Sequence, residues 1–565
     1  MRGGTTARRG RRLRDRLPVR LRHHWKPAAT LGVALAATVW FLGDARISPY
    51  VTSSSRVEAD AITDDVQGTI GLYDTSAQHS IQLTYQQTDF DKMMKEFKDD
   101  GTKDYIEADL TVDGVYLNDV GIRLKGNSTL SSLRGGKGMP GGGRELPEGA
   151  QGAPAGGAPG GAAGGGEKGK RAAEPGAAGG GPGATDGKGG AGAAAGGKGG
   201  AAAGGRAGMG GMVQYDLSAD KPEELPWLVK IDEYVEGRAY QGEREISLRP
   251  GSDDQVPLNE ALALSLTEQS SQKAERYAFT ELKVNNRYAT TRLMVEAPDT
   301  DYADDVADGN GVLYKARASG SFDYKGDDPS DYESSFKQLN KKGSQDLEPV
   351  MKLIKWVDSA SDEEFAKNLH QYVDVDSLAD YVASQNLLLN FDDMAGPGKN
   401  YLLWYDLDTK KFSVLGWDYN LTFSGDATAG PDDSVSMGGG MPGGTPEGAP
   451  EGKPENMPEG MPGGAAGGGD GDKGAKAGRG GMMQHALKTK FTESDAFDGV
   501  YQKAYRKLFQ QFYGSGTAAK NLADIAAQAR SAGADSTALD TAVATLRKTV
   551  TDRTAALAED KKVTG

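Results

Sequence analysis

The sequence predicts an α+β fold, interrupted by two long glycine-rich segments and followed by a C-terminal helical region. Short alternating runs typical of strands are mixed with stretches whose apolar residues recur at helical spacing. Of the 81 glycines in 565 residues, 34 fall in residues 135–212 and 19 in residues 430–483. The rest of the chain therefore has an ordinary globular glycine content, and the lack of a G-X-Y period excludes collagen.

The folded part begins near residue 67, and strand patterns dominate it up to residue 134. The runs are short and bounded by turn residues, and they cover residues 68–74, 80–85 and 105–126. A hairpin turn is predicted at Asp113-Gly114, because both residue types tolerate positive φ. One helix is predicted over residues 89–97, where four apolar residues recur at helical spacing: Phe90, Met93, Met94 and Phe97.

Helices and strands alternate after the first glycine-rich segment. A helix is predicted over residues 254–270, with Pro257 at its start. Residues 277–297 predict two strands around an Asn285-Asn286 turn, and a further strand is predicted over residues 311–316. The remaining predicted elements are helices over residues 344–371 and 376–390, the latter with Asp376 as N-cap, and amphipathic helices near residues 497–512 and 539–557.

The two glycine-rich segments, residues 135–212 and 429–483, are predicted to be disordered. Such sequence buries too little apolar surface to offset the entropy of ordering it. The first segment interrupts a strand-rich region, so its two ends are expected to lie close together, as in a loop insertion. A tolerated surface loop is the simplest interpretation of its role, and a segment that threads through the cell wall or a flexible contact arm is the alternative. The C-terminal helical region, residues 484–565, is expected to pack on the main domain.

An apolar segment near the N-terminus predicts export or anchoring. Residues 27–43 carry no charge and follow residues 1–26, which hold ten Lys or Arg and one acidic residue. This pattern is typical of a signal anchor or a cleaved export signal, and we favour the uncleaved anchor over a secreted protein. A buried soluble helix is the remaining alternative. The positive-inside rule places residues 1–26 in the cytoplasm and the body outside the cell membrane, with residues 44–66 as a linker.

The composition excludes several kinds of site. The chain has no cysteine, which rules out disulfide scaffolds, thiolate zinc sites and cysteine nucleophiles. It has five histidines, two of them directly before the apolar segment, so a histidine-based metal site or a Ser-His-Asp triad is not expected. The net charge of −15 includes an excess of nine positive charges in residues 1–26. The acidic body argues against binding of nucleic acid.

Carboxylate and amide side chains gather in residues 390–420. Asp392 and Asn400 flank a glycine-containing loop, and Asp418 follows the apolar strand KFSVLGW. Such oxygens are the ligands that Mg²⁺ prefers, with phosphate oxygens and water completing its shell. A carboxylate beside them can orient or deprotonate an attacking hydroxyl. Turn-forming Asp and Asn residues without chemistry are the alternative interpretation of this spacing.

Cationic residues at two strand ends complete the candidate chemistry. Residues 121–129, GIRLKGNST, end a strand in a hydroxyl-rich turn whose backbone N–H groups, with Arg123 and Lys125, suit phosphate oxygens. Lys230 lies in an apolar strand and needs either solvent or a carboxylate, for which Glu260 on the following helix is a candidate. Solvated cations at strand ends are the alternative interpretation.

Seven segments together carry a resemblance to a known family. They are GIRLKGNST (121–129), WLVKID (227–232), LNEALA (258–263), residues 277–297, GVLYKA (311–316), NFDD to GKNYLLWYD (390–406) and KFSVLGWDYN (411–420). In this order they resemble the CotH family, the spore coat protein H-like atypical kinases. The resemblance implies a protein-kinase-like fold of two lobes, in a single domain that residues 67–134 and 213–428 form together. It also implies transfer of the ATP γ-phosphoryl group to protein hydroxyls.

The resemblance implies a role for each candidate residue. The residues near the nucleotide would be Arg123, Lys125, Gly126, Asn127, Ser128, Lys230 and Glu296, the last on the adenine side. Lys230 would pair with Glu260. Asp392 would take the place of the catalytic-loop Asp. The metal ligands would be Asp418, Asn400 and Asn420, with Asp418 as the principal one.

The sequence departs from the family pattern in three ways. Asn420 stands where a second acidic residue is usual, which weakens the expected metal site. The spacing between Asp392 and Asn400 is longer than in ordinary kinases. Asp393 competes with Asp392 for the catalytic role, although we prefer Asp392.

The predicted protein is therefore a membrane-anchored extracytoplasmic kinase that uses ATP and Mg²⁺ to phosphorylate Ser or Thr hydroxyls of envelope or spore-coat-type proteins. A catalytically weak or inactive cell-surface binding or structural protein on a kinase-like scaffold is the alternative, because ATP is scarce outside the membrane. A phosphotransferase acting on a non-protein envelope polymer is a second alternative.

Overall fold

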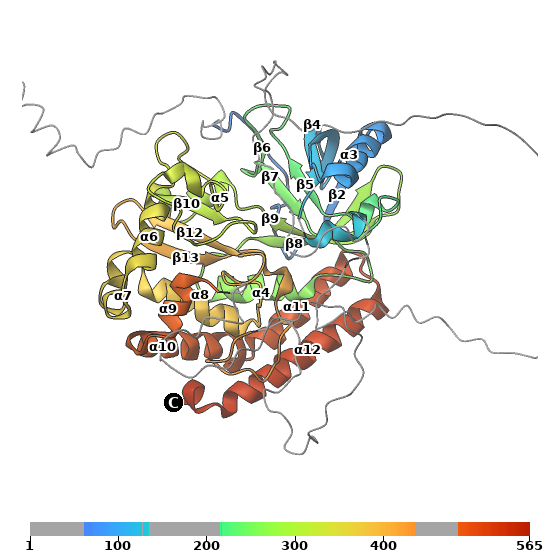
Figure 1. Cartoon of the computed structure of the whole chain (residues 1–565). Coiled ribbons are helices and arrows are strands. Elements are labelled where there is room, and N and C mark those ends of the chain that lie inside the picture. Colours follow the sequence, from blue (N-terminus) through green and yellow to red (C-terminus); the bar gives the residue numbers. More distant parts are fainter. Residues whose placement is uncertain (1–60, 127, 135–214, 216, 436–483) are drawn as a thin grey trace, which may run out of the picture. The chain divides into compact units, whose positions relative to one another are not determined.

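The computed structural model describes residues 61–126, 128–134, 215, 217–435 and 484–565 (Figure 1). They fall in one unit of the chain, residues 58–565. The predicted basic tail and membrane anchor, and nearly all of both glycine-rich segments, lie outside the described residues. Within the part that the structure describes, no helix combines the length and the apolar character needed to cross a bilayer.

A closed β-barrel forms the first part of the fold. In the described ranges its seven strands follow the spatial order β2 (His79–Tyr85), β3 (Ile106–Val112), β4 (Val115–Leu124), β5 (Trp227–Lys230), β7 (Glu245–Leu248), β9 (Thr290–Glu296) and β8 (Tyr277–Val284). Neighbours are antiparallel except β2 and β8, which are parallel. The predicted turn joins β3 to β4, and Asp113 and Gly114 both have positive φ there.

The first glycine-rich segment lies in the connection between two paired strands. β4 and β5 are antiparallel neighbours, with Leu124 opposite Trp227. The chain therefore leaves the barrel and returns to it at adjacent positions. Helix α3 (Gln87–Asp100) buries the four apolar residues that predicted it, and they join the core of the barrel.

A second sheet and a set of helices form the next part. Among the described strands, β11 (Phe336–Gln338), β10 (Gly311–Ala316), β12 (Tyr401–Asp406) and β13 (Phe412–Gly416) make an antiparallel sheet in this order. The helices of this part are α4 (Leu258–Gln269), α5 (Thr300–Asp304), α6 (Glu348–Ser359), α7 (Asp362–Asn368) and α8 (Val375–Leu387). A short parallel pair, β1 (Asp64–Val66) with β6 (Arg238–Tyr240), lies apart from both sheets.

The mixture of helices and strands agrees with the predicted α+β class, but two local predictions are wrong. Residues 68–74 form turns rather than a strand, because they carry two glycines and pair with no other strand. Helix α8 is capped by Asp374, not by Asp376. The Asp374 carboxylate accepts a hydrogen bond of 3.0 Å from the backbone N–H of Ser377, so Asp376 lies in the first turn.

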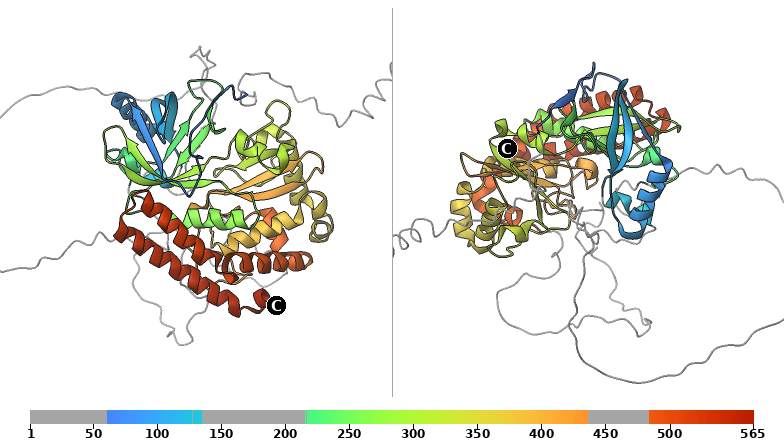
Figure 2. Two further views of the ribbon diagram at one scale, coloured as in Figure 1. Left: turned by 180° about the vertical axis from the view of Figure 1, so that it is seen from behind. Right: turned by 90° about the horizontal axis from the view of Figure 1, so that it is seen from above.

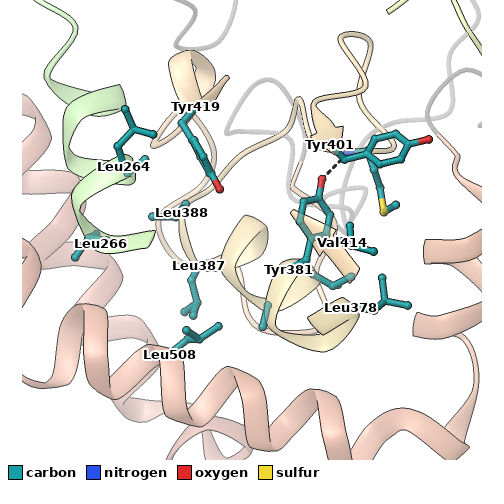
Figure 3. Packing of buried hydrophobic residues seen from close by; sticks show 14 of the residues in the cluster. Leu264, Leu266, Leu378, Tyr381, Leu387, Leu388, Tyr401, Val414, Tyr419 and Leu508 are labelled. Atoms are coloured by element: carbon teal, nitrogen blue, oxygen red, sulfur yellow. Dashed lines mark hydrogen bonds between the residues drawn. The ribbon is translucent and has the colours of Figure 1, made fainter. Parts of the chain in front are cut away.

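The C-terminal region adds helices that pack on the rest of the fold (Figures 1 and 2). They are α9 (Ala486–Thr492), α10 (Asp498–Phe509), α11 (Thr517–Ser531), α12 (Ser536–Glu559) and α13 (Lys561–Thr564). Helix α10 packs against α8, and α11 packs against both α4 and α12. The shared apolar core includes, as Figure 3 shows, Leu264 and Leu266 of α4, Leu387 of α8 and Leu508 of α10.

A fully buried arginine ties α12 to the end of α8. The Arg553 guanidinium donates hydrogen bonds of 2.9 Å to both the backbone carbonyl and the side-chain oxygen of Asn386, and it also contacts the carbonyl oxygens of Leu387 and Ala429. These acceptors include carbonyls of the last turn of a helix, which a cation satisfies and stabilises electrostatically. Arg553 therefore fixes the place at which α8 ends and the segment 389–400 begins.

We expect Arg553→Met to lower the free energy of unfolding by about 3 kcal/mol or more, because several buried carbonyl oxygens lose their donor. Thermal or urea unfolding of the purified chain, followed by circular dichroism, measures the change. Arg547→Met on the exposed face of the same helix is the matched control, with an expected effect within about 0.5 kcal/mol. Equal effects of the two substitutions would contradict this role of Arg553.

Candidate active site

The segment from residue 389 to residue 423 holds an unusual concentration of left-handed backbone. Leu389, Lys399, Asp418 and Phe423 all have φ between 51° and 57°. This conformation is uncommon for residues other than glycine, and such strain is concentrated at functional sites. The segment contains the predicted catalytic and metal-binding residues, so the backbone itself marks it as a candidate active site.

Asp392 is held by hydrogen bonds to both of its carboxylate oxygens. The backbone N–H of Gly398 donates to one oxygen, and the side-chain amide of Asn400 donates to the other at 3.1 Å. Burial raises the pKa of Asp392 to about 6, although the Gly398 N–H acts in the opposite direction. Gly398 is required here, because a Cβ at its position would collide with the Asp392 carboxylate. The loop between these residues therefore closes on Asp392.

The three oxygen-bearing residues of the sequence prediction come together in the structure. The Asn400 amide N–H group also donates to the backbone carbonyl of Asp418, at 3.4 Å. Asn400 thus links Asp392, after α8, to Asp418, after β13. Asp418 directly precedes a short 3₁₀ turn, Tyr419–Leu421, and its left-handed conformation sets the direction of its carboxylate.

A buried arginine joins this group to helix α4. Arg249 follows β7, and its guanidinium forms ion pairs with Glu260 of α4 and, at 3.0 Å, with Asp418. Burial acts to lower the pKa of Arg249, but Glu260 and Asp418 outweigh it and raise the pKa above its usual value. The guanidinium of Arg292 donates to the backbone carbonyl of Arg249 at 2.7 Å, which fixes the end of β7.

The predicted ion pair between Lys230 and Glu260 is therefore not formed. Lys230 pairs with Glu233 at 2.7 Å instead. β5 and β7 are antiparallel, with Lys230 opposite Glu245 and Trp227 opposite Leu248. Lys230 and Arg249 consequently lie at opposite ends of the strand pair, about 13 Å apart along it. Helix α4 follows Arg249 in the chain and meets that end.

Several buried polar atoms of this group have no hydrogen-bond partner among the described residues. They are Arg249 Nε, Glu260 Oε2, Glu275 Oε2 and Asn420 Oδ1. Glu275 is 3% exposed, and its other oxygen accepts a hydrogen bond of 3.3 Å from the backbone N–H of Asp418. Burial raises the pKa of both Glu260 and Glu275 to about 7. Buried polar atoms without partners at one place favour a site that takes a polar ligand.

Lys125 places a further positive charge near Arg249. Lys125 follows β4, and no hydrogen bond or ion pair joins its ammonium group to another described residue. Burial lowers the pKa of Lys125 to about 7, and the positive charges of Arg249 and Lys315 add to this effect. Lys315 lies over the ring of Trp417 at 3.5 Å. The positive charges of Arg249 and Lys315 near Lys125 favour an anionic ligand beside it.

The other predicted phosphate contacts lie along the same strand end. Arg123 stacks on Tyr105, with its guanidinium 5.1 Å from the ring centroid. Gly126 has a φ of +104°, and its carbonyl accepts a hydrogen bond of 2.9 Å from Lys103. Asn127 lies outside the described residues, and only the backbone of Ser128 is described. Their roles toward phosphate stay predictions.

Two further residues of the predicted site, Glu296 and Asp393, form ion pairs with residues outside it. Glu296, at the end of β9, pairs with Arg276 and accepts a hydrogen bond of 2.9 Å from its backbone N–H. Asp393 pairs with Lys488 of α9. Asp393 thus has a cation of its own, whereas Asp392 is hydrogen-bonded to Asn400. This difference favours Asp392 as the residue that faces a substrate.

The side-chain oxygens of Asp418, Asn400 and Asn420 suit a divalent cation such as Mg²⁺, although only one of the three side chains carries a negative charge. No group of three or more His, Asp or Glu side chains among the described residues is arranged to hold a metal ion. Asp418, Asn400 and Asn420 offer one carboxylate and two amide oxygens, of the kind that Mg²⁺ binds together with phosphate oxygens and water. Asn420 Oδ1, which has no hydrogen-bond partner among the described residues, agrees with such a ligand set, whereas Asp418 Oδ1 lies 3.0 Å from the Arg249 guanidinium.

Sequence reasoning missed Arg249, Glu275 and Lys488. Arg249 stands at the end of the strand EISL, directly before Pro250, where a solvated strand-end cation is the ordinary expectation. Its position nine residues before the start of α4 was the one signal that could have identified it. Glu275 and Lys488 reach the site only through the folding of distant segments.

Comparison with known proteins agrees with the geometry. Residues 217–458 match the family model described as CotH kinase protein. No curated protein matches the chain. The family match covers Arg249, Glu260, Asp392, Asn400 and Asp418, and it supports a kinase-type function in general. The predicted resemblance is thereby confirmed, because residues 217–458 match the CotH kinase family.

Proposed function

We propose that the chain is an ATP-dependent phosphotransferase that phosphorylates Ser or Thr hydroxyls of envelope or spore-coat-type proteins. The observation that carries the proposal is one continuous set of contacts from Asp392 through Asn400 and Asp418 to Arg249 and Glu260. It combines a buried carboxylate for the acceptor, amide and carboxylate oxygens for a metal, and a fixed cation for phosphate. Phosphoryl transfer requires these three functions and little else.

Asp392 would orient the acceptor hydroxyl and take its proton. Its carboxylate is fixed by Gly398 and Asn400, so it cannot turn away from an incoming hydroxyl. A raised pKa makes the ionised carboxylate a better proton acceptor than an exposed aspartate. A fixed geometry of this kind lowers the entropic part of the barrier.

Lys125 and Arg249 would bind and neutralise the nucleotide phosphates. Lys125 follows β4 and Arg249 follows β7, on either side of β5 and at the same end of these strands, and Arg249 pairs with Asp418. Burial and the neighbouring positive charges lower the pKa of Lys125, so an anionic partner would stabilise its charged form. Asp418, Asn400 and Asn420 would hold Mg²⁺, which supplies neutralisation of the phosphate oxygens when bound. Arg249 would keep Asp418 oriented through its ion pair and α4 attached through Glu260.

The proposal also includes the cellular location of this reaction, which is the outer side of the cell membrane. The charge-free residues 27–43 after the ten basic residues of segment 1–26 favour a single-pass anchor. The catalytic region would then lie on the outer side of the cell membrane, beside envelope proteins. Mapping by protease protection of intact cells tests this orientation.

We expect Asp418→Ala to reduce phosphoryl transfer by about 100- to 1,000-fold or more, because the proposed metal loses its one carboxylate ligand. The measurement is transfer of labelled phosphate from ATP, to the chain itself and to envelope protein fractions. Asp376→Ala removes an exposed aspartate from α8 and serves as the matched control. Full activity of Asp418→Ala would rule out the proposed metal ligand.

Substitutions of Arg249 and Lys230 are expected to differ in their effects on nucleotide binding. We expect Arg249→Met to weaken nucleotide binding at least about tenfold and to abolish transfer, because Glu260 and Asp418 both lose their buried partner. Lys230→Met should have a much smaller effect, since Lys230 pairs with the partly exposed Glu233. Titration with a fluorescent ATP analogue in the presence of Mg²⁺ compares the two. The reverse order would restore the role that the sequence predicted for Lys230.

A binding protein without turnover is the second candidate function. The observation that favours it is Asn420, an amide where a second metal-binding acid is expected, so that the metal site has one carboxylate. Metal-dependent nucleotide binding without transfer to any protein or polymer acceptor would support this candidate.

A further inference from the structure

The C-terminal helices reach the loop that carries Asp392. Helix α9 begins at Ala486, beyond residues 217–458 that match the family. The Nζ atom of Lys488 in this helix forms an ion pair with the carboxylate of Asp393. Asp393 is 4% exposed, and the Lys488 side chain is 27% exposed. A segment outside the matched family region thus provides a partly buried cation next to the proposed catalytic residue.

Asp393 organises the loop that closes on Asp392. Its Oδ1 atom accepts a hydrogen bond of 2.8 Å from the backbone N–H of Ala395, and its carbonyl accepts one of 2.9 Å from Gly396. The resulting turn brings Gly396 against Asp392, where a Cβ would lie 2.5 Å from the Asp392 Cα atom. Two residues later, Gly398 donates to the Asp392 carboxylate. Contacts therefore run without a break from Lys488 to the carboxylate of Asp392.

Neighbouring contacts fix α9 at this position. The buried imidazole of His485, directly before α9, shares a hydrogen bond of 3.0 Å with the Tyr401 hydroxyl, next to Asn400 in the chain. The Lys490 ammonium donates to the carbonyl of Ala360, away from the loop. Lys488 is therefore held on a rigid element, and a cation on a rigid element can fix the carboxylate that it faces.

We propose that Lys488 is a positioning residue for phosphoryl transfer, and that the C-terminal helical region is part of the functional enzyme through it. Lys488 holds Asp393, and Asp393 holds the turn that presents Gly398 to Asp392. The inference rests on the proposed function for its effect on catalysis. Its structural part, the ordering of residues 391–400 by Lys488, is testable without any activity.

The experiment compares Lys488→Met, Lys488→Arg and the matched control Lys490→Met in the full chain. We expect Lys488→Met to lower kcat by about 10- to 100-fold with the KM for ATP nearly unchanged, because the acceptor-side carboxylate is displaced and the phosphate side is not. Lys488→Arg should restore most of kcat, and Lys490→Met should resemble the unmodified chain. Hydrogen–deuterium exchange should become faster in residues 391–400 of Lys488→Met alone.

The outcomes separate this inference from the proposed function. Unchanged kcat and unchanged exchange in Lys488→Met would overturn the inference, and so would equal losses in Lys490→Met. If the unmodified chain transfers no phosphate, the proposed function fails, and the exchange experiment still decides whether Lys488 orders the loop. Should Lys488→Met not fold, the double variant Lys488→Gln/Asp393→Asn, which leaves no buried charge unpaired, takes its place with the same expected results.

Discussion

The placement of Arg249 between Glu260 and Asp418 is the constraint on which the candidate site depends. The three side chains come from the end of β7, from α4 and from the turn after β13, so one guanidinium connects the barrel, a helix and the second sheet. The pair with Glu260 is almost completely buried, and removal of either partner would leave an unpaired charge. Such an arrangement fixes geometry more than it adds stability.

A second constraint acts from the opposite side of the candidate site. Arg553 and Tyr505 bind the side chain of Asn386, and Tyr513 donates to the carbonyl of Leu387 at 2.7 Å. The C-terminal helices thereby satisfy the end of α8, three residues before the loop that begins at Asn390. Together with Lys488 at Asp393 and His485 at Tyr401, they determine the position of the loop from both of its ends. The region beyond the family match therefore belongs to the same structural unit as the loop that carries Asp392.

Sequence reasoning located the loop residues but not their cation. Asp392, Asn400 and Asp418 were found because they lie at strand and helix ends within 27 residues, where local geometry brings them together. The sequence favours Lys230 as the cation, because a lysine in an apolar strand needs either solvent or a carboxylate partner. Arg249 stands at the end of a strand, where a solvated cation is the ordinary expectation. The register that places Arg249 beside α4 depends on the order of strands in the barrel, which no local pattern encodes. Lys488 is 95 residues from Asp393 in the chain and could not be assigned to it from sequence.

The charges around Arg249 explain why this geometry suits a metal and a nucleotide together. One guanidinium faces the carboxylates of Glu260, Asp418 and Glu275, while Lys125 lies close both to this guanidinium and to Lys315. In a buried place, the acids need additional positive charge and the lysines need additional negative charge. In the proposed function, a divalent cation at Asp418 would meet the first need, and phosphate oxygens beside Lys125 would meet the second. Neither ligand alone would balance the site, so each is expected to strengthen binding of the other.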